Sequence, residues 1–303
     1  MPPWTMVAAG LAAIFAIVAA YLFAAVPSET RDLSGLRGDP ERGAYVLRLG
    51  GCVACHSGAE GSGGFLAGGA PIVTPFGAFA GPNITPHDDY GIGGWTLDAF
   101  ADALTNGRSP SGASYYPVFP YTSYTLMSDQ DIVDLWAYMQ TVEPVASASP
   151  RHEIAFPFNI RMLLRPWKTL FFDPGAFTAE PDRSGAGDRG ASGFSVPGHW
   201  RQRPTPRAVL GGSDESRRLE GSDTGPDGEK VPAITREALE RNGWTAPVLA
   251  FSLSFGIMAD GDAFGGSMGE VVEDSTKYLT EADRMAIAAY LLDETGSDQP
   301  SGP

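Results

Sequence analysis

The two cysteines of the chain stand together in the segment Cys52-Val53-Ala54-Cys55-His56. C-x-x-C-H is the attachment signature of a c-type haem. Two intervening residues let one helical turn present both sulfurs to one porphyrin edge, and the adjacent histidine supplies the proximal nitrogen to iron. A zinc half-site needs further ligands and the chain has no third cysteine, while a redox dithiol does not require the trailing histidine. The motif predicts covalent haem c on Cys52 and Cys55, with His56 as a metal ligand.

An uncharged apolar run of 21 residues lies near the N-terminus, at positions 6–26. As a helix it spans roughly 30 Å, the thickness of a bilayer core. A cleaved signal peptide is the alternative, but no lysine or arginine precedes the run and residues 23–27 are a poor cleavage site. We expect an uncleaved transmembrane anchor. Haem c is attached outside the bacterial plasma membrane, so the expectation is a single-pass inner-membrane protein whose soluble part is periplasmic.

The chain of 303 residues has a formal net charge of −15, concentrated near the C-terminus. Residues 208–303 hold 18 acidic against 7 basic residues. This charge argues against a nucleic-acid partner. Two interpretations remain, a solvated acidic surface and a surface that docks to a basic redox partner.

The chain also contains an internal duplication, because residues 127–139 align without gaps on residues 279–291. Each copy begins with a hydroxyl residue followed three positions later by aspartate, and continues with apolar residues at helical spacing. This pattern is close to a capping box at a helix N-terminus. The paired residues are Ser128 with Asp131, and Thr280 with Asp283.

Longer stretches resemble a known family. They are residues 68–77, 83–86, 91–96, 116–124 and 156–161 in the first half, and 197–199, 205–207, 210–212, 231–235 and 265–272 in the second. On these stretches the chain resembles the membrane-anchored dihaem cytochrome c proteins related to the cytochrome c subunits of periplasmic alcohol and sugar dehydrogenases. It departs from them at the second haem motif, where Trp200, Arg203 and Pro204 replace both cysteines and the histidine. One haem c per chain is therefore expected.

The resemblance implies a mainly α fold, with an N-terminal transmembrane helix followed by two tandem cytochrome c-like helical domains, the second haem-free. The expected boundaries are 1–28 for the anchor, 38–172 for the haem domain, 173–195 for a linker, 196–296 for the degenerate domain and 297–303 for a disordered tail. We expect the second domain to be folded but redox-silent. The large side chains expected to fill its vacant pocket are Trp200, Trp244, Phe251, Phe255 and Phe264.

The sixth iron ligand of an electron-transfer cytochrome is usually a methionine sulfur. Relatives commonly place an axial methionine where this chain has Phe119, which cannot ligate iron. Met127, directly before the capped helix, is the expected ligand. Met139, His87 and an open five-coordinate iron remain alternatives. Met268 resembles the axial methionine of the lost second haem.

Other residues are expected around the first haem. Asn83, Trp95 and Arg108 are candidates for contacts with the haem propionates. Pro71 is a candidate to accept a hydrogen bond from Nδ1 of His56, the bond that orients an iron-bound imidazole. Residues 156–172 are apolar and aromatic but carry basic residues, so they predict either packing between the repeats or a segment on the membrane surface or against a partner.

These features predict an electron carrier and not an enzyme. It would carry single electrons between a dehydrogenase or quinol-oxidising complex and a terminal oxidase or another cytochrome of a respiratory chain. The alternatives are a haem-based sensor or ligand-binding module with an open sixth site, and a structural subunit of a respiratory or photosynthetic complex.

Overall fold

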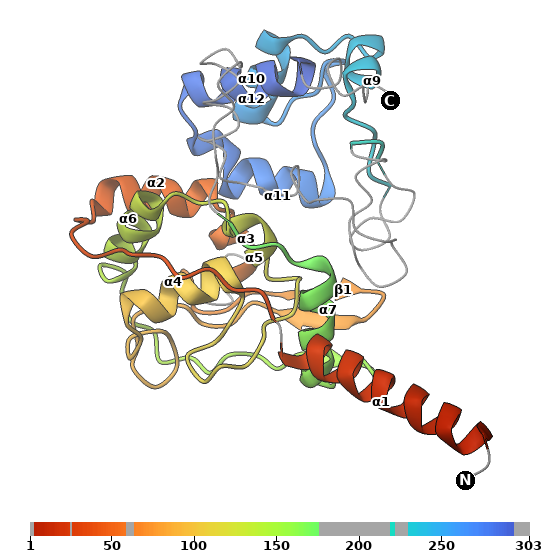
Figure 1. Cartoon of the computed structure of the whole chain (residues 1–303). Helices are drawn as coiled ribbons and strands as arrows, with labels where there is room; N and C mark the ends of the chain where they lie inside the picture. The colour runs from red at the N-terminus through yellow and green to blue at the C-terminus, as the bar shows by residue number, and fades with distance from the viewer. Residues whose placement is uncertain (1–2, 25, 59–63, 176–218, 222–229, 294–303) are drawn as a thin grey trace.

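The computed structural model describes residues 3–24, 26–58, 64–175, 219–221 and 230–293. Within these ranges the chain is mainly helical, which confirms the expectation of a mainly α fold (Figure 1). The helices are α1 (Pro3–Ala24), α2 (Pro40–Leu49), α3 (Cys52–His56), α4 (Leu97–Asn106), α5 (Tyr121–Tyr124), α6 (Asp129–Met139), η1 (Arg161–Leu163), α7 (Leu164–Phe171), α9 (Arg236–Arg241), α10 (Ala246–Phe255), α11 (Gly266–Asp274), η6 (Thr276–Tyr278) and α12 (Glu281–Asp293). The strands are β1 (Pro71–Thr74), β2 (Gly77–Ala80) and β3 (Glu153–Ile154). Trp200, most of the expected linker and the expected tail lie outside the described residues.

Helices α2 and α6 cross closely and frame the core of the first domain. A side chain at Gly43 would place its Cβ 2.0 Å from the carbonyl oxygen of Asp134, so only glycine permits this approach. The buried Asp134 carboxylate strengthens the crossing, because it accepts hydrogen bonds from the backbone N–H of Asp39 at 2.8 Å and from Gln130 at 2.7 Å. Arg42 adds an ion pair to Asp134 at 2.9 Å.

The variant Gly43→Val is expected to destabilise the first domain strongly. The added side chain cannot fit without separating α2 from α6, which should cost about 3 kcal/mol or more. Thermal unfolding of the purified protein measures the effect. Gly94→Ala is the matched control, because its added Cβ would lie 4.0 Å from the nearest atom outside its immediate neighbours, the carbonyl oxygen of Asp88. An unchanged melting temperature for Gly43→Val would contradict the close crossing.

The two predicted capping boxes are confirmed. The hydroxyl of Ser128 accepts from the backbone N–H of Asp131 at 3.1 Å and donates to its carboxylate at 2.7 Å. Thr280 makes the same pair of bonds to Asp283, at 3.2 and 2.7 Å. The two copies of the duplicated segment therefore start their helices, α6 and α12, with the same local chemistry.

A second structural correspondence links the repeats ahead of those helices. Helices α4 and α10 both end at a glycine in the left-handed conformation, Gly107 with φ 58° and Gly256 with φ 70°. Each glycine carbonyl then accepts a backbone hydrogen bond from a residue eight positions on, Tyr115 at 2.8 Å and Phe264 at 2.7 Å. Gly256 and Phe264 thus lie the same number of positions after Gly107 and Tyr115. The same separation between the repeats matches Phe119 with Met268, the residue expected to be the relic ligand of the lost haem.

The second repeat packs against the first through α2. Leu49 shares a buried cluster with Leu279 and Ile287. Arg48 donates to the carbonyl oxygen of Asp274 at 3.1 Å, and its guanidinium lies 4.2 Å from the centre of the Tyr278 ring. Part of the core of the second repeat is therefore completed by the first.

The expectation that large aromatic side chains fill a vacated pocket in the second repeat is not met for two of them. Phe251 is 49% exposed and Phe255 is 65% exposed, because α10 turns these rings outward where they contact each other at 4.7 Å. Trp244 does pack against a buried cluster and stacks on Phe264 at 6.3 Å.

Helix α7 joins the first domain to the N-terminal helix. One interpretation of residues 156–172 placed them between the repeats, but α7 does not pack against the described helices of the second repeat. It lies against the C-terminal end of α1 (Figure 1). The side chain of Lys168 points into the domain, where its amino group donates to the carbonyl oxygens of Asn106 and Gly107, both at 2.7 Å. Lys168 thereby satisfies carbonyls at the C-terminal end of α4, an end that favours positive charge.

Because Lys168 is buried, we expect the free energy of unfolding to change with pH in the alkaline range. Burial lowers the pKa of Lys168 from 10.5 to about 8. Between these two values the unfolded chain binds more protons than the folded chain, so stability rises with pH across that window, by about 3 kcal/mol. Chemical denaturation at pH 7.5 and pH 10.5 should show this rise in the natural protein and its loss in Lys168→Met. An equal rise in both proteins would contradict the assignment.

Among the described residues, one helix is long and apolar enough to cross a membrane, over residues Trp4–Ala24 of α1. It extends away from the rest of the protein as a single helix, and its side chains between Trp4 and Tyr21 are largely exposed (Figure 1).

Candidate functional site

The C-x-x-C-H motif forms the short helix α3, directly after α2. Gly51 precedes it in the left-handed conformation with φ 65°, which glycine adopts without the cost that a Cβ imposes, and this turns the chain sharply from one helix into the next. Cys52, Cys55 and His56 all line one cavity. Neither cysteine forms a disulfide, so both sulfurs are available for thioether bonds.

The imidazole of His56 is held in one orientation. Its Nδ1 lies 2.7 Å from the carbonyl oxygen of Pro82, to which the N–H form donates, and this leaves Nε2 free to bind a metal. Burial lowers the pKa of His56, which favours the neutral form that a metal needs. The predicted acceptor, Pro71, is wrong, because Pro71 starts strand β1 and pairs with Ala80 in the sheet.

A small antiparallel sheet, in the order β1-β2-β3, borders the cavity. The loop after β2 passes so close to α3 that a Cβ at Gly81 would lie 1.7 Å from the carbonyl oxygen of Cys55. Gly69 makes a similar approach at 2.1 Å. The two glycines therefore let the loops enclose the attachment helix.

The cavity has a volume of about 920 Å³, in the upper range for cofactor pockets. Its lining is mostly apolar and aromatic, including Phe79, Ile92, Phe100, Leu104 and Leu135. A large planar apolar group with a metal at its centre fits this lining, the two nearby thiols and the oriented imidazole. The residues present therefore fit a covalently attached haem.

Both thiols are protonated in this setting. Burial raises the pKa of Cys52 to about 12, with a smaller contribution from Cys55. The pKa of Cys55 is also raised, mainly by burial and secondarily by the carboxylate of Glu270 in α11. Thiols of this kind are poor free nucleophiles, which argues against a thioredoxin-like exchange site.

The structure brings two of the three predicted propionate contacts to the cavity. Asn83 and Trp95 line it, although the amide of Asn83 already donates to the carbonyl oxygens of Val145 and Ser147, at 2.8 and 2.9 Å. Arg108 is not part of the described lining. It is drawn to the carboxylate of Asp102, with its Nε 2.6 Å from Oδ2.

Two arginines that the sequence interpretation missed do line the cavity. They are Arg151 and Arg161, on either side of strand β3. The guanidinium of Arg161 lies 4.9 Å from the centre of the Tyr116 ring and donates to the carbonyl oxygen of Ser114 at 3.2 Å. These two cations could pair with carboxylates of a bound cofactor. Arg161 belongs to a stretch that carries the family resemblance, so its position could have suggested a role.

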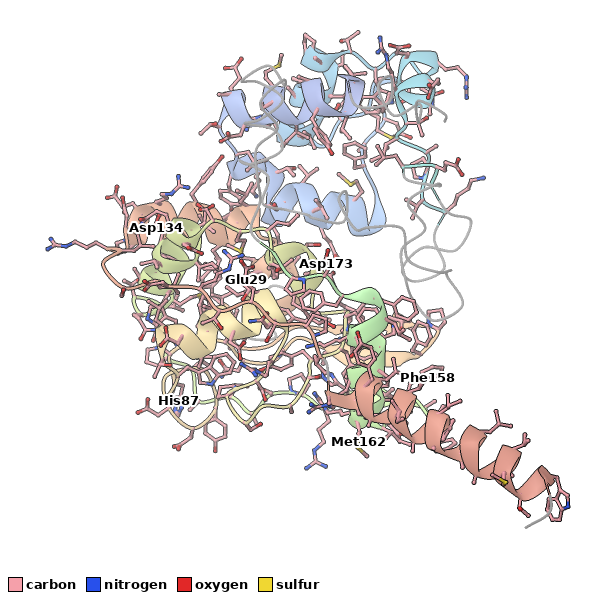
Figure 2. The ribbon with its side chains drawn as sticks, in the orientation of Figure 1. Glu29, His87, Asp134, Phe158, Met162 and Asp173 are labelled. Carbon is pink, nitrogen blue, oxygen red and sulfur yellow. The ribbon has the colours of Figure 1, made fainter. Side chains whose placement is uncertain are left out.

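The placement of the methionines differs from the sequence expectation. Met127 is buried in the main hydrophobic core but is not among the residues that line the cavity, because it ends the turn after α5 and its carbonyl is bound by Arg31 at 2.6 Å. Met139 and Phe119 do line the cavity. His87 stands in an exposed loop outside the described lining, where its Nδ1 accepts from the backbone N–H of Asp89 at 3.2 Å (Figure 2).

Comparison with known proteins places the chain among cytochromes. A family model described as cytochrome c matches residues 40–143. The chain is 41% identical over 289 residues to a protein named diheme cytochrome c-type from Cereibacter sphaeroides, covering 93% of this chain and 96% of that one. It is 36% identical over 270 residues to the fructose dehydrogenase cytochrome subunit of Gluconobacter japonicus, covering 88% of this chain and 55% of the subunit.

A further relative is the cytochrome c subunit of alcohol dehydrogenase (quinone) from Gluconacetobacter polyoxogenes. It is 34% identical over 292 residues, which cover 92% of this chain and 60% of the subunit. The chain therefore spans between half and two thirds of the length of these two dehydrogenase subunits, and nearly the whole length of the diheme relative.

Proposed function

Because the chain belongs to the cytochrome c family and is related to the cytochrome subunits of dehydrogenases, we propose that it carries single electrons from a periplasmic dehydrogenase or quinol-oxidising complex to a terminal oxidase or another cytochrome. Cytochromes of this family are electron carriers and not catalysts themselves. The observation that carries the proposal is the cavity in which Cys52, Cys55 and His56 meet beneath an apolar lining.

The residues of the cavity have distinct roles in this proposal. Cys52 and Cys55 would hold the haem by thioether bonds, and His56 would bind its iron through Nε2 while the carbonyl of Pro82 fixes the imidazole ring. The bound haem supplies an iron that changes between the ferric and ferrous states. The apolar lining excludes water from the ring, and a drier surrounding disfavours the additional charge of the ferric state. Trp95 and the two arginines of the lining are the groups able to contact the propionates, because both amide N–H groups of Asn83 are already bonded to Val145 and Ser147.

We propose one haem per chain. The support is the sequence at the second expected attachment motif, where Trp200, Arg203 and Pro204 leave no thiol and no imidazole. The relative from Cereibacter sphaeroides is named as a diheme cytochrome, so the loss of a second attachment site would distinguish this chain from that relative. The second repeat, proposed to span 196–296, then serves as a folded domain without its own covalent redox group.

We also propose that α1 anchors the protein in the bacterial inner membrane, with the haem domain, proposed to span 38–172, in the periplasm. The support is the length and apolar composition of α1 and the extracytoplasmic attachment of haem c. A tether of this kind raises the effective concentration of the carrier near membrane-bound partners.

Two methionines are candidates for the sixth iron ligand. Met127 is the ligand expected from the sequence, whereas Met139 is the methionine whose side chain lines the cavity. We expect Met139→Ala to abolish the sulfur-to-iron charge-transfer band near 700 nm and to lower the reduction potential, because a thioether ligand favours ferrous iron. Met127→Ala is the matched comparison. A band lost only in Met127→Ala would restore the ligand expected from the sequence.

A second function is favoured by one observation, Phe119 in the lining at the place where relatives carry a ligating methionine. If neither methionine binds, the iron is five-coordinate and the protein is a ligand-binding haem module. Carbon monoxide added to the ferrous protein distinguishes the two functions. A Soret band that shifts at micromolar concentrations of carbon monoxide would support the ligand-binding function. An unchanged spectrum would support the electron-carrier function.

The electron-carrier function is tested directly in membranes that contain the protein. Adding an alcohol or sugar oxidised by a periplasmic dehydrogenase should reduce the haem, and oxygen should reoxidise it unless the terminal oxidase is blocked with cyanide. A haem that does not respond to any respiratory substrate but is reduced by dithionite would contradict the proposal.

A further inference from the structure

Exposed apolar side chains are concentrated on the segment that leads into α7, the helix that packs against the end of α1. Six large apolar side chains are exposed between residues 156 and 170, among them Phe156 at 78% and Met162 at 63%. We call this set the apolar rim; its members are Phe156, Phe158, Ile160, Met162, Leu163 and Leu170. We propose that the apolar rim inserts into the lipid interface of the membrane, beside the point where α1 enters it, and so fixes the orientation of the haem domain. This inference rests on the proposed span of α1.

Helix α7, which follows most of the rim and carries Leu170, is bonded directly to α1. The Nε of Arg165 donates to the carbonyl oxygen of Phe23 at 2.8 Å, and the hydroxyl of Thr169 donates to the carbonyl oxygen of Leu22 at 2.9 Å. These carbonyls belong to the last turn of α1 and have no partner within the helix. Because α7 holds the last turn of the span, the residues next to α7 must lie near the headgroups.

Side chains of the rim lie close to this junction. Figure 2 draws Phe158 and Met162 in the region where α1 meets α7, and the short helix η1 that carries Met162 contacts α7. A cluster of this size in a water-soluble domain is a mark of an interaction surface, since scattered single apolar residues are the usual pattern. Apolar side chains beside a membrane span, with Trp167 in the same segment, match the composition of the lipid interface.

The charge around the rim suits a lipid surface. Residues 151–171 hold four basic residues and one acidic residue, in a chain whose net charge is −15. The exposed cations are Arg151, Arg161 and Arg165, since Lys168 is buried; Arg151 and Arg161 stand at the edge of the haem cavity that they also line. Each exposed cation near an anionic leaflet contributes favourable attraction. The basic, apolar rim and the acidic C-terminal region therefore suit different partners, lipid for the first and protein for the second.

Insertion of the rim has a consequence for the haem cavity. Asn159 and Arg161, which alternate with rim residues along the chain, line that cavity. A domain seated on its rim therefore holds one edge of the cavity close to the membrane surface. Electron exchange with a membrane-bound partner would use that edge, at a fixed orientation and not by free tumbling on the tether.

The test uses the full-length haem protein in vesicles of phosphatidylcholine and phosphatidylglycerol. A phospholipid with a photoactivatable diazirine in its acyl chain labels the residues that contact lipid, and mass spectrometry locates the label. We expect label in α1 and, several-fold above the level near Leu36, in residues 156–163. Leu36 is also exposed, and it lies in the loop before α2. Phe156→Glu combined with Met162→Glu should remove the second label and leave the first, whereas Leu36→Glu should change neither.

The outcomes separate the rim from the span. Label in α1 with residues 156–163 at the Leu36 level would overturn insertion of the rim and leave the anchor in place. Absence of label from both would overturn the anchor and the rim together. Rim residues that are labelled in nanodiscs with one chain but unlabelled in nanodiscs with two would show that a second copy displaces the lipid, which would overturn lipid as the occupant whenever two chains meet. Should the double variant lose its haem spectrum, the labelling pattern of the natural protein still decides the matter.

Discussion

The variant with Cys52→Ala and Cys55→Ala is expected to carry no covalent haem at all. These are the only cysteines of the chain, so no other residue can form a thioether to the porphyrin. Haem staining on a denaturing gel should fall to background for this variant, while the natural protein gives one stained band. Each single variant keeps one thiol and should retain part of the stain.

The same variant should also be much less stable. Without its haem the cavity of about 920 Å³ loses the group that its apolar lining contacts, and large cavities cost stability in proportion to their volume. Circular dichroism during heating measures the loss. A stained band that persists in the double variant would contradict covalent attachment at α3.

A haem content of one per chain is the second expected result. The diheme relative shares most of its length with this chain, so a pyridine haemochrome assay against protein concentration gives a clear distinction between one and two. A second haem cannot be attached covalently, because tryptophan at position 200 and arginine at position 203 cannot add to a haem vinyl group. A ratio of two would contradict the loss of the second attachment site.

Restoring the motif supplies a matched experiment. The triple variant Trp200→Cys, Arg203→Cys and Pro204→His recreates a C-x-x-C-H segment in the second repeat. The capped helix α12 and the turn at Gly256 match their first-repeat counterparts, and Met268 corresponds to Phe119. We therefore expect the haem content to rise toward two, and a spectrum with a second methionine-ligated component.

Much of the fold followed from local patterns in the sequence. The capping boxes at Ser128 and Thr280 were predictable because a cap uses residues only three positions apart. The apolar helix α1 follows from the composition of a single segment. The pairing of β2 with β3 and the close crossing at Gly43 did not follow, since they depend on backbone approaches between residues far apart in the chain.

The candidate site divides in the same way. The sequence by itself determined the attachment chemistry, because both thiols and the imidazole occur within five residues and one helical turn aligns them. Only the tertiary structure decided that Pro82 and not Pro71 orients His56, that Met139 and not Met127 lines the cavity, and that Arg108 turns to Asp102. The physical reason is that a covalent motif is a property of neighbouring residues, whereas the lining of a cavity depends on which distant loops the packed core brings against it.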